Sequence, residues 1–129
     1  MIRAKEIRFV LVSDDYEAAV RLYRDVFAFE VRMDLEDQDG SGVIFELPAA
    51  TLELVDPAHE RFVDEIEVGR TTPDHRIRIA VNVDALEEAA GEVTAAGAVP
   101  MAPAVQTPWG DHNQRFRIED GSQLTLFQS

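Results

Sequence analysis

The stretch Ile7-Arg8-Phe9-Val10-Leu11, followed by Asp14, returns seventy residues later as Ile77-Arg78-Ile79-Ala80-Val81, followed by Asp84. Apolar side chains occupy every second position in both stretches, as is typical of a β-strand with one buried face. An Asp shortly after a strand is typical of the cap that begins a helix. The repeat therefore predicts two similar structural units, each beginning with a strand and continuing as a helix.

The rest of each half supports the same interpretation. Apolar residues spaced three and four apart follow both aspartates, namely Tyr16, Ala19, Val20 and Tyr23, and then Leu86, Ala89, Ala90 and Val93. This spacing predicts two amphipathic helices. Late in each half an alternating stretch predicts a further strand, Thr51–Val55 and then Gln123–Phe127. Two units that each bury one face leave two open faces, and we expect a ligand to occupy the cleft between them.

The predicted elements give an α+β protein made of two tandem βαβββ modules, which form an open, curved sheet around a cleft. The first module is expected to contain strand 6–12, helix 14–27, strand 29–34, a loop at Gly40-Ser41-Gly42, and a hairpin of 43–47 with 51–55. The second is expected to contain strand 76–83, helix 85–96, strand 99–101, strand 113–118, a turn at Asp120-Gly121, and strand 123–127. We therefore predict a single domain 1–129, with modules at about 6–56 and 76–128 and a connector at 57–75.

Composition excludes several classes of function. The net charge of −13 argues against partners such as nucleic acid and anionic membrane surfaces, which bind basic proteins. The absence of cysteine excludes disulfides, thiolate catalysis and cysteine-bound zinc. No apolar run approaches the roughly 20 residues that a membrane helix needs, and no signal-peptide pattern begins the chain. We expect a cytoplasmic protein.

The two-residue period of strands predicts which side chains line the open face. One wall is expected to be apolar, formed by Val10, Val12, Val43 and Phe45. The other is expected to carry arginine and polar residues, including Arg8, Arg78, Arg115, Arg117, Glu53 and Thr125. Two interpretations of these arginines stay open. They either form a structural ion-pair cluster with Glu53 or clamp a carboxylate or phosphate of a ligand, for which the planar guanidinium is well suited.

Two segments resemble a known family. The run Ser13-Asp14-Asp15-Tyr16-Glu17-Ala18-Ala19-Val20-Arg21-Leu22-Tyr23 resembles the first strand-to-helix signature of the vicinal oxygen chelate superfamily, which includes glyoxalase I, extradiol dioxygenases and bleomycin-resistance proteins. Thr107-Pro108-Trp109-Gly110, with Phe116-Arg117-Ile118-Glu119-Asp120-Gly121, is similar to a stretch of the bleomycin-resistance proteins. The resemblance implies the glyoxalase/bleomycin-resistance fold and a homodimer. It is closest to the metal-free, bleomycin-resistance-like members, in which aromatic residues line the groove, so Trp109 is a candidate ligand contact.

The resemblance also locates where metal-dependent members hold their ion. The corresponding positions here are Arg8, Glu53, Arg78 and Thr125. Guanidinium groups are permanently protonated and offer no lone pair, so we expect no metal and no other cofactor. The three histidines, His59, His75 and His112, are expected to be exposed loop residues.

We therefore expect a metal-free binding protein rather than an enzyme, sequestering an antibiotic or metabolite with an apolar body and an anionic group. The predicted ligand-binding residues are Arg8, Phe45, Glu53, Arg78, Trp109, Arg115, Arg117 and Thr125. One alternative is an enzyme of the same superfamily (lyase, isomerase or dioxygenase-like). Such an enzyme would either use Glu53 as a base or hold a metal at an unrecognised site. The paired arginines are expected to keep Glu53 ionised and weakly basic, which disfavours the first of these. Another alternative is an interaction module whose open sheets only dimerise.

Overall fold

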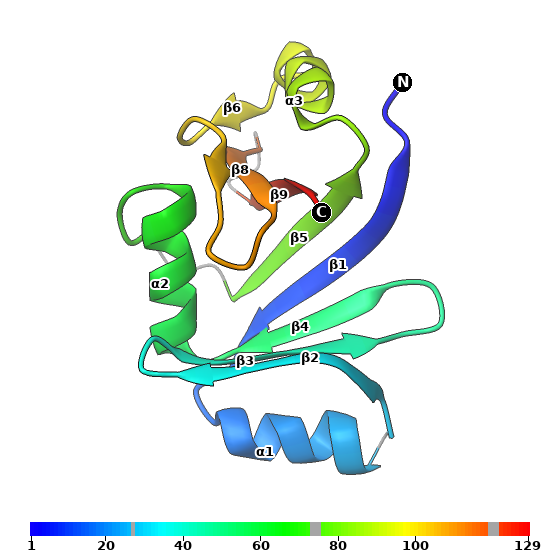
Figure 1. Cartoon of the computed structure of the whole chain (residues 1–129), viewed down its shortest axis with the longest axis vertical. Coiled ribbons are helices and arrows are strands. Elements are labelled where there is room, and N and C mark those ends of the chain that lie inside the picture. The colour runs from blue at the N-terminus through cyan, green and yellow to red at the C-terminus, as the bar shows by residue number, and fades with distance from the viewer. Residues whose placement is uncertain (27, 73–75, 119–121) are drawn as a thin grey trace.

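A single curved sheet forms the body of the protein (Figure 1). The computed structural model describes residues 1–26, 28–72, 76–118 and 122–129. The sheet order is β2-β3-β4-β1-β5-β9-β8-β6, and β7 pairs with β8. The strands are β1 (Ala4–Val12), β2 (Glu30–Asp37), β3 (Gly40–Glu46), β4 (Thr51–Val55), β5 (Ile77–Val83), β6 (Val99–Pro100), β7 (Val105–Gln106), β8 (His112–Arg117) and β9 (Gln123–Gln128). The predicted α+β class with an open, curved sheet is confirmed.

The first strands of the two repeats pair with each other at the middle of the sheet. β1 and β5 run antiparallel, with Phe9 opposite Ile79 and Arg8 opposite Ala80. Each then pairs in parallel with the last strand of its own half, β1 with β4 and β5 with β9. The repeat read from the sequence thus appears as two similar halves on either side of the β1–β5 pair.

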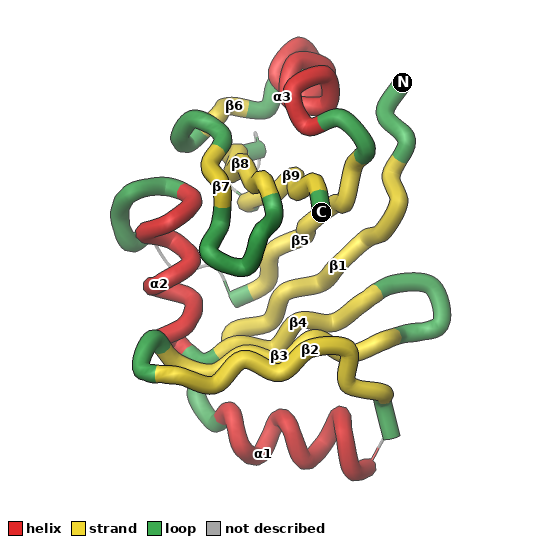
Figure 2. Tube along the Cα trace, viewed as in Figure 1, coloured by secondary structure: helices red, strands yellow, loops and turns green. Residues whose placement is uncertain are grey.

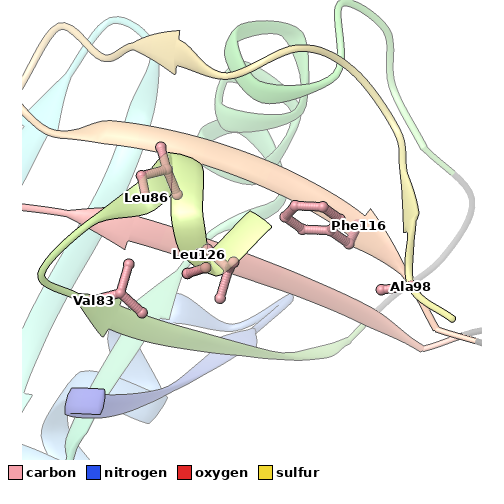
Figure 3. Close-up of a cluster of buried hydrophobic side chains, with 6 residues drawn as sticks. Val83, Leu86, Ala98, Phe116 and Leu126 are labelled. Atoms are coloured by element: carbon pink, nitrogen blue, oxygen red, sulfur yellow. The ribbon is translucent and has the colours of Figure 1, made fainter. Parts of the chain in front are cut away.

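Two helices cover the ends of the outer face of the sheet. α1 (Tyr16–Val20) continues as a π-helical segment, η1 (Arg21–Val26), and packs on a cluster formed by Val43, Phe45, Leu52 and Leu54. α3 (Leu86–Ala95) packs on Val83, Phe116 and Leu126 of the second half (Figure 3). Because α1 and α3 lie under the two ends of the sheet, the middle strands are left between them (Figure 1).

A third helix, α2 (Pro57–Glu67), lies in the segment predicted to be only a connector (Figure 2). Asp56 caps its first turn by accepting a hydrogen bond from the His59 backbone N–H at 2.8 Å, and Pro57 occupies the first turn. The helix ends before Gly69, whose φ of +82° suits glycine. Three of its acidic residues, Glu60, Asp64 and Glu67, are buried. α2 therefore rests on the concave face that the sequence predicted to be open.

Two local predictions are corrected by the structure. Phe45 lies opposite Leu52 and Val43 opposite Leu54, so both side chains pack under α1 and not on the concave face with Glu53. Ile44, opposite Glu53, takes that place. The predicted loop at Gly40–Gly42 is the start of β3, and β7 was not foreseen. The predicted turn at Asp120-Gly121 lies outside the described residues.

Apolar side chains remain exposed on the outer face, between α1 and α3. Ile7 and Phe9 of β1 are 44% and 40% exposed, and Ile77 and Ile79 of β5 are 63% and 44% exposed. The registers place these four residues side by side on adjacent strands. In the described part of the chain, none of the helices has the length and apolar character needed to cross a membrane.

Candidate functional site

A cavity of about 200 Å³ lies on the concave face, bordered by the sheet, α2 and the loop before β8. Its polar lining residues are Glu6, Arg8, Arg32, Glu53, His59, Glu67, Arg78, Asn82, Asp111, Asn113 and Ser129. Its apolar and aromatic lining residues are Met33, Leu35, Ile44, Val63, Ala80, Trp109 and Phe127. The lining is therefore mixed, with charged groups that converge on one concave space, and such a cavity is a candidate site for a small molecule.

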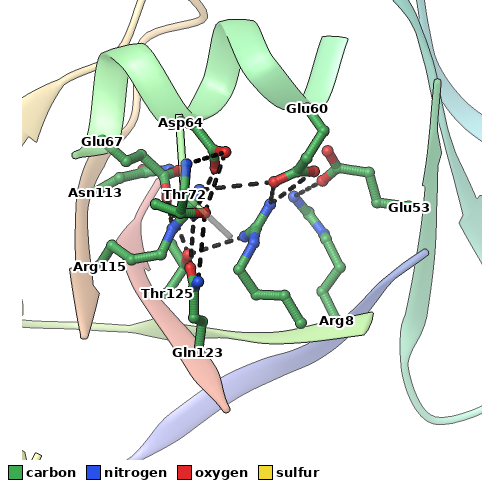
Figure 4. A network of polar contacts seen from close by, with 11 residues as sticks. Arg8, Glu53, Glu60, Asp64, Glu67, Thr72, Asn113, Arg115, Gln123 and Thr125 are labelled. Atoms are coloured by element: carbon green, nitrogen blue, oxygen red, sulfur yellow. Dashed lines mark hydrogen bonds and ion pairs between the residues drawn. The ribbon is translucent and has the colours of Figure 1, made fainter. Parts of the chain in front are cut away.

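Arg115 is at the centre of a buried network beside this cavity (Figure 4). Its side chain is fully buried, and it donates hydrogen bonds to Asp64 at 2.7 Å and Glu67 at 2.9 Å, both on α2. It also donates to Gln123 of β9 at 2.9 Å. Buried carboxylates are stable only when paired in this way. The carboxylates of α2 thus neutralise an arginine that the sequence assigned to the ligand.

Arg78 is bound in the same manner. Its side chain is 4% exposed and it donates to Glu60 of α2 at 3.3 Å and to Thr125 at 2.8 Å. Burial opposes its charge, but the carboxylates of Glu60, Glu67 and Glu53 outweigh burial and raise the pKa of Arg78. Arg78 therefore stays protonated, and its charge is compensated mainly by the protein.

Arg8 lines the cavity and keeps part of its capacity to bind a ligand. Its Nε donates to Glu6 and Thr51, its Nη2 to Glu6 at 3.0 Å, and its Nη1 to Glu53 at 3.5 Å, which is long. A guanidinium has five N–H groups, so among the described residues one N–H on each Nη atom is uncommitted. Its Cζ atom lies over the Phe127 ring, 4.7 Å from the ring centre, a cation–π contact on the wall of the cavity.

Glu53 accepts a single, long side-chain hydrogen bond among the described residues, from Arg8 Nη1 at 3.5 Å. Burial raises the pKa of Glu53, against the opposing effects of Arg78 and Arg8. The sequence predicted the reverse, a weakly basic carboxylate held by paired arginines. The difference arises because both arginines bond mainly to other carboxylates: Arg8 to Glu6, and Arg78 to Glu60. Bonds from Thr51 and Arg8 outweigh the burial of Glu6 and lower its pKa.

The side chains at the superfamily's metal positions do not fit a divalent ion. Arg8 and Arg78 are cations with no free lone pair, and Thr125 already bonds to Arg78 and Glu67. Only Glu53 offers a carboxylate. Nor do His, Asp and Glu side chains form any group of three suited to a metal ion elsewhere within the described ranges.

The predicted ligand-binding residues separate into three groups. Those that line the cavity are Arg8, Glu53, Arg78 and Trp109. Arg115 and Thr125 lie behind it in the buried network, bound to carboxylates of α2. Phe45 lies in the core under α1, and Arg117 is exposed at the end of β8. The roles of these residues in binding stay predictions, but the structure brings only the first group to the cavity wall.

Sequence reasoning missed several lining residues. His59 was expected to be exposed, yet it is 5% exposed on α2 and faces the cavity. The missed signal was the spacing of Glu60, Asp64 and Glu67, which puts three carboxylates on one helical face. His112 is exposed on β8, in keeping with its predicted exposure but not with a loop position. His75 lies outside the described residues.

The paired halves, the curved sheet and the concave cavity define the glyoxalase type of fold. The sequence profile of the Glyoxalase/Bleomycin resistance protein/Dioxygenase superfamily matches residues 7–126, and the chain belongs to this superfamily. A comparison with curated proteins finds no match.

Solved structures show the same fold. A methylmalonyl-CoA epimerase from Streptomyces coelicolor, in complex with 2-nitronate-propionyl-CoA, is 17% identical with a TM-score of 0.72, over 100% of this chain and 99% of that chain. A superfamily member from Vibrio splendidus 12B01 is 16% identical with a TM-score of 0.62, over the full length of both chains. A hypothetical protein from Bacillus halodurans C-125 is 15% identical with a TM-score of 0.70, over 95% of this chain and 91% of that chain. At these identities the likeness concerns the fold alone.

Proposed function

We propose that the protein binds a small molecule with an apolar body and an anionic group in the concave cavity, without a metal ion. The observation that supports this most is Arg8, whose guanidinium lies over the Phe127 ring and keeps two N–H groups available among the described residues. A carboxylate is the natural acceptor for a pair of guanidinium N–H groups. Trp109, Met33 and Ile44 offer apolar surface for the rest of the ligand.

The size of the cavity narrows the choice between antibiotic and metabolite. Its volume of about 200 Å³ is smaller than the roughly 300–1,000 Å³ of sites for drug-sized ligands. α2 accounts for the small volume, because it fills the part of the concave face beside β8 and β9. A metabolite-sized acid is therefore favoured over a large glycopeptide.

A titration followed by Trp109 fluorescence and calorimetry tests this proposal, because Trp109 is the single tryptophan and lines the cavity. We expect an aromatic acid such as 3-phenylpropionate to bind, and a cationic glycopeptide not to. Arg8→Gln is expected to weaken acid binding by about tenfold or more. Arg61→Gln, which removes an exposed arginine of α2, serves as the charge-matched control. Tight binding of the glycopeptide alone would refute the proposal.

A second candidate is an acid–base enzyme that uses Glu53. The observation that favours it is the burial of Glu53 in the cavity, which raises the pKa of this carboxyl group toward the range useful for proton transfer. We expect an enzyme of this kind to exchange the α-proton of a 2-methylacyl thioester with D₂O, as measured by proton NMR. Glu53→Gln is expected to abolish the exchange, while Glu30→Gln on exposed β2 leaves it unchanged. No exchange with the unaltered protein would remove this candidate.

We also propose a homodimer formed through the outer face. The support is the adjacent set of exposed side chains Ile7, Phe9, Ile77 and Ile79, because contiguous apolar surface of this kind marks interaction sites. The near-symmetry of the β1–β5 pair makes the surface suited to a second copy of itself. Analytical ultracentrifugation is expected to give a dimer, and Phe9→Glu a monomer. Val26→Glu, which changes an exposed apolar residue elsewhere, should remain dimeric. A monomeric unaltered protein would contradict this.

A further inference from the structure

The carboxylates that line the cavity differ in how far the protein compensates them. Glu6 is bound by Arg8, and Glu67 is bound by Arg115. Glu53 accepts one long side-chain bond among the described residues, although an ionised carboxylate has about four acceptor sites. Its Oε2 atom, which has no donor there, is not one of the fully buried polar atoms, and the side chain is 17% exposed on the cavity wall. A ligand that carries a donor can therefore reach Glu53.

The guanidinium of Arg8 and the carboxylate of Glu53 are neighbours on adjacent strands. β1 and β4 are parallel, with Arg8 opposite Thr51 and Val10 opposite Glu53, so both side chains point to the concave face. Arg8 Nη1 lies 3.5 Å from Glu53 Oε1. An acid that binds the available N–H groups of Arg8 thus brings its carboxylate close to Glu53. Two carboxylates that share one site repel each other, so a ligand with a positive charge between them is favoured.

A second carboxyl group of the cavity is also short of positive charge. Asp111, in the loop before β8, lines the cavity beside Trp109. Burial raises the pKa of Asp111, although Arg8 lowers it. Burial likewise raises the pKa of Glu53 against the effect of its arginine neighbours. A carboxyl group whose pKa stays raised near an arginine has less positive charge around it than its burial requires. A cationic group in the cavity would stabilise both carboxylates.

We propose that the ligand is an α-amino acid with an apolar side chain, whose carboxylate is bound by Arg8 and whose ammonium group is bound by Glu53. This inference rests on the proposed binding function and names its ligand class. The two charged groups of an α-amino acid are attached to one carbon atom, which suits a guanidinium and a carboxylate 3.5 Å apart. The ammonium group has three N–H donors for the free acceptor sites of Glu53. The side chain of the ligand then packs on Trp109 and Ile44.

Calorimetry with three probes that share a phenyl body tests the inference. The probes are phenylalanine (carboxylate and ammonium), 3-phenylpropionate (carboxylate alone) and 2-phenylethylamine (ammonium alone). We expect phenylalanine to bind at least about tenfold more tightly than 3-phenylpropionate, because its ammonium group adds charge-assisted hydrogen bonds. Equal or weaker binding of phenylalanine would overturn the ammonium site while leaving the proposed acid binding intact. Binding of 2-phenylethylamine alone, or of no probe, would overturn both.

A substitution assigns the effect to Glu53. Glu53→Gln keeps the size of the side chain and removes its charge, so phenylalanine and 3-phenylpropionate are expected to bind it with affinities within about threefold of each other. Circular dichroism checks that this variant folds, and the probe comparison on the unaltered protein decides the inference if it does not. Glu30→Gln makes the same change on exposed β2, outside the cavity, and should keep the full preference. A preference for phenylalanine that persists in folded Glu53→Gln would refute the role of Glu53.

Discussion

Replacement of Arg115 by Met tests whether α2 is held on the sheet by buried charge. The side chains of Asp64 and Glu67 are 2% and 1% exposed, and both bond to the fully buried Arg115. Arg115→Met leaves these carboxylates without their main counter-charge, although Thr72 still donates to Asp64, and Asn113 and Thr125 still donate to Glu67. Breaking a buried ion pair on one side costs about 3–5 kcal/mol. This is a large part of the roughly 5–15 kcal/mol by which a native domain is stable.

The free energy of unfolding is measured by urea denaturation, followed by circular dichroism and Trp109 fluorescence. Adding Asp64→Asn and Glu67→Gln to Arg115→Met removes the unpaired charges and is expected to recover most of the loss, because uncharged replacements of buried ion pairs are often tolerated. Arg24→Met, which breaks an exposed pair with Asp25, is the control and should leave stability unchanged. A loss below about 1 kcal/mol for Arg115→Met, or no recovery in the triple variant, would refute the reasoning.

Three further predictions concern single residues. The pKa of Glu53 is higher in the folded protein than in the unfolded chain, so between these two pKa values the folded protein binds more protons. The free energy of unfolding therefore falls as pH rises through the range between them. The free energy of unfolding of Glu53→Gln minus that of the unaltered protein should therefore increase from acid to neutral pH in urea titrations; a flat difference would contradict the raised pKa. Gly40→Ala should cost about 1–3 kcal/mol, because φ is +109° and the added Cβ would lie 2.4 Å from the His59 backbone nitrogen; thermal unfolding with no loss would contradict this. Phe45→Ala should lower the free energy of unfolding, measured in urea, by about 3–5 kcal/mol without changing acid affinity, since Phe45 is a core residue. Weakened acid binding with no loss of stability would contradict this and favour the predicted position in the cavity.

The repeat in the sequence was sufficient to predict the fold, because strand alternation and helix spacing are local signals. β1 and β5 with their helices, and the hairpin of β3 and β4, occur where these signals placed them. The prediction of which β3 side chains point to the concave face was wrong, because this depends on which residues of β3 and β4 pair across the turn. Phe45 pairs with Leu52, and a shift of one residue moves every side chain to the other face.

The site was harder to predict because α2 supplies carboxylates that compensate its buried arginines. A sequence shows that Arg8, Arg78 and Arg115 share a face, but it does not show which carboxylates reach them from a helix elsewhere in the chain. Glu60, Asp64 and Glu67 lie in the segment 57–75, which was predicted to be only a connector, whereas they compensate Arg78 and Arg115. The roles of all three arginines in ligand binding stay predictions, and the proposed function assigns the ligand's anionic group to Arg8.

A crystal structure of the complex with 3-phenylpropionate would test the central claim, that the concave cavity binds an acid at Arg8, most directly. We expect the carboxylate within hydrogen-bond distance of Arg8 and the phenyl ring against Trp109 or Ile44. A divalent ion coordinated by Glu53, or a ligand bound elsewhere with the concave cavity unchanged, would contradict it.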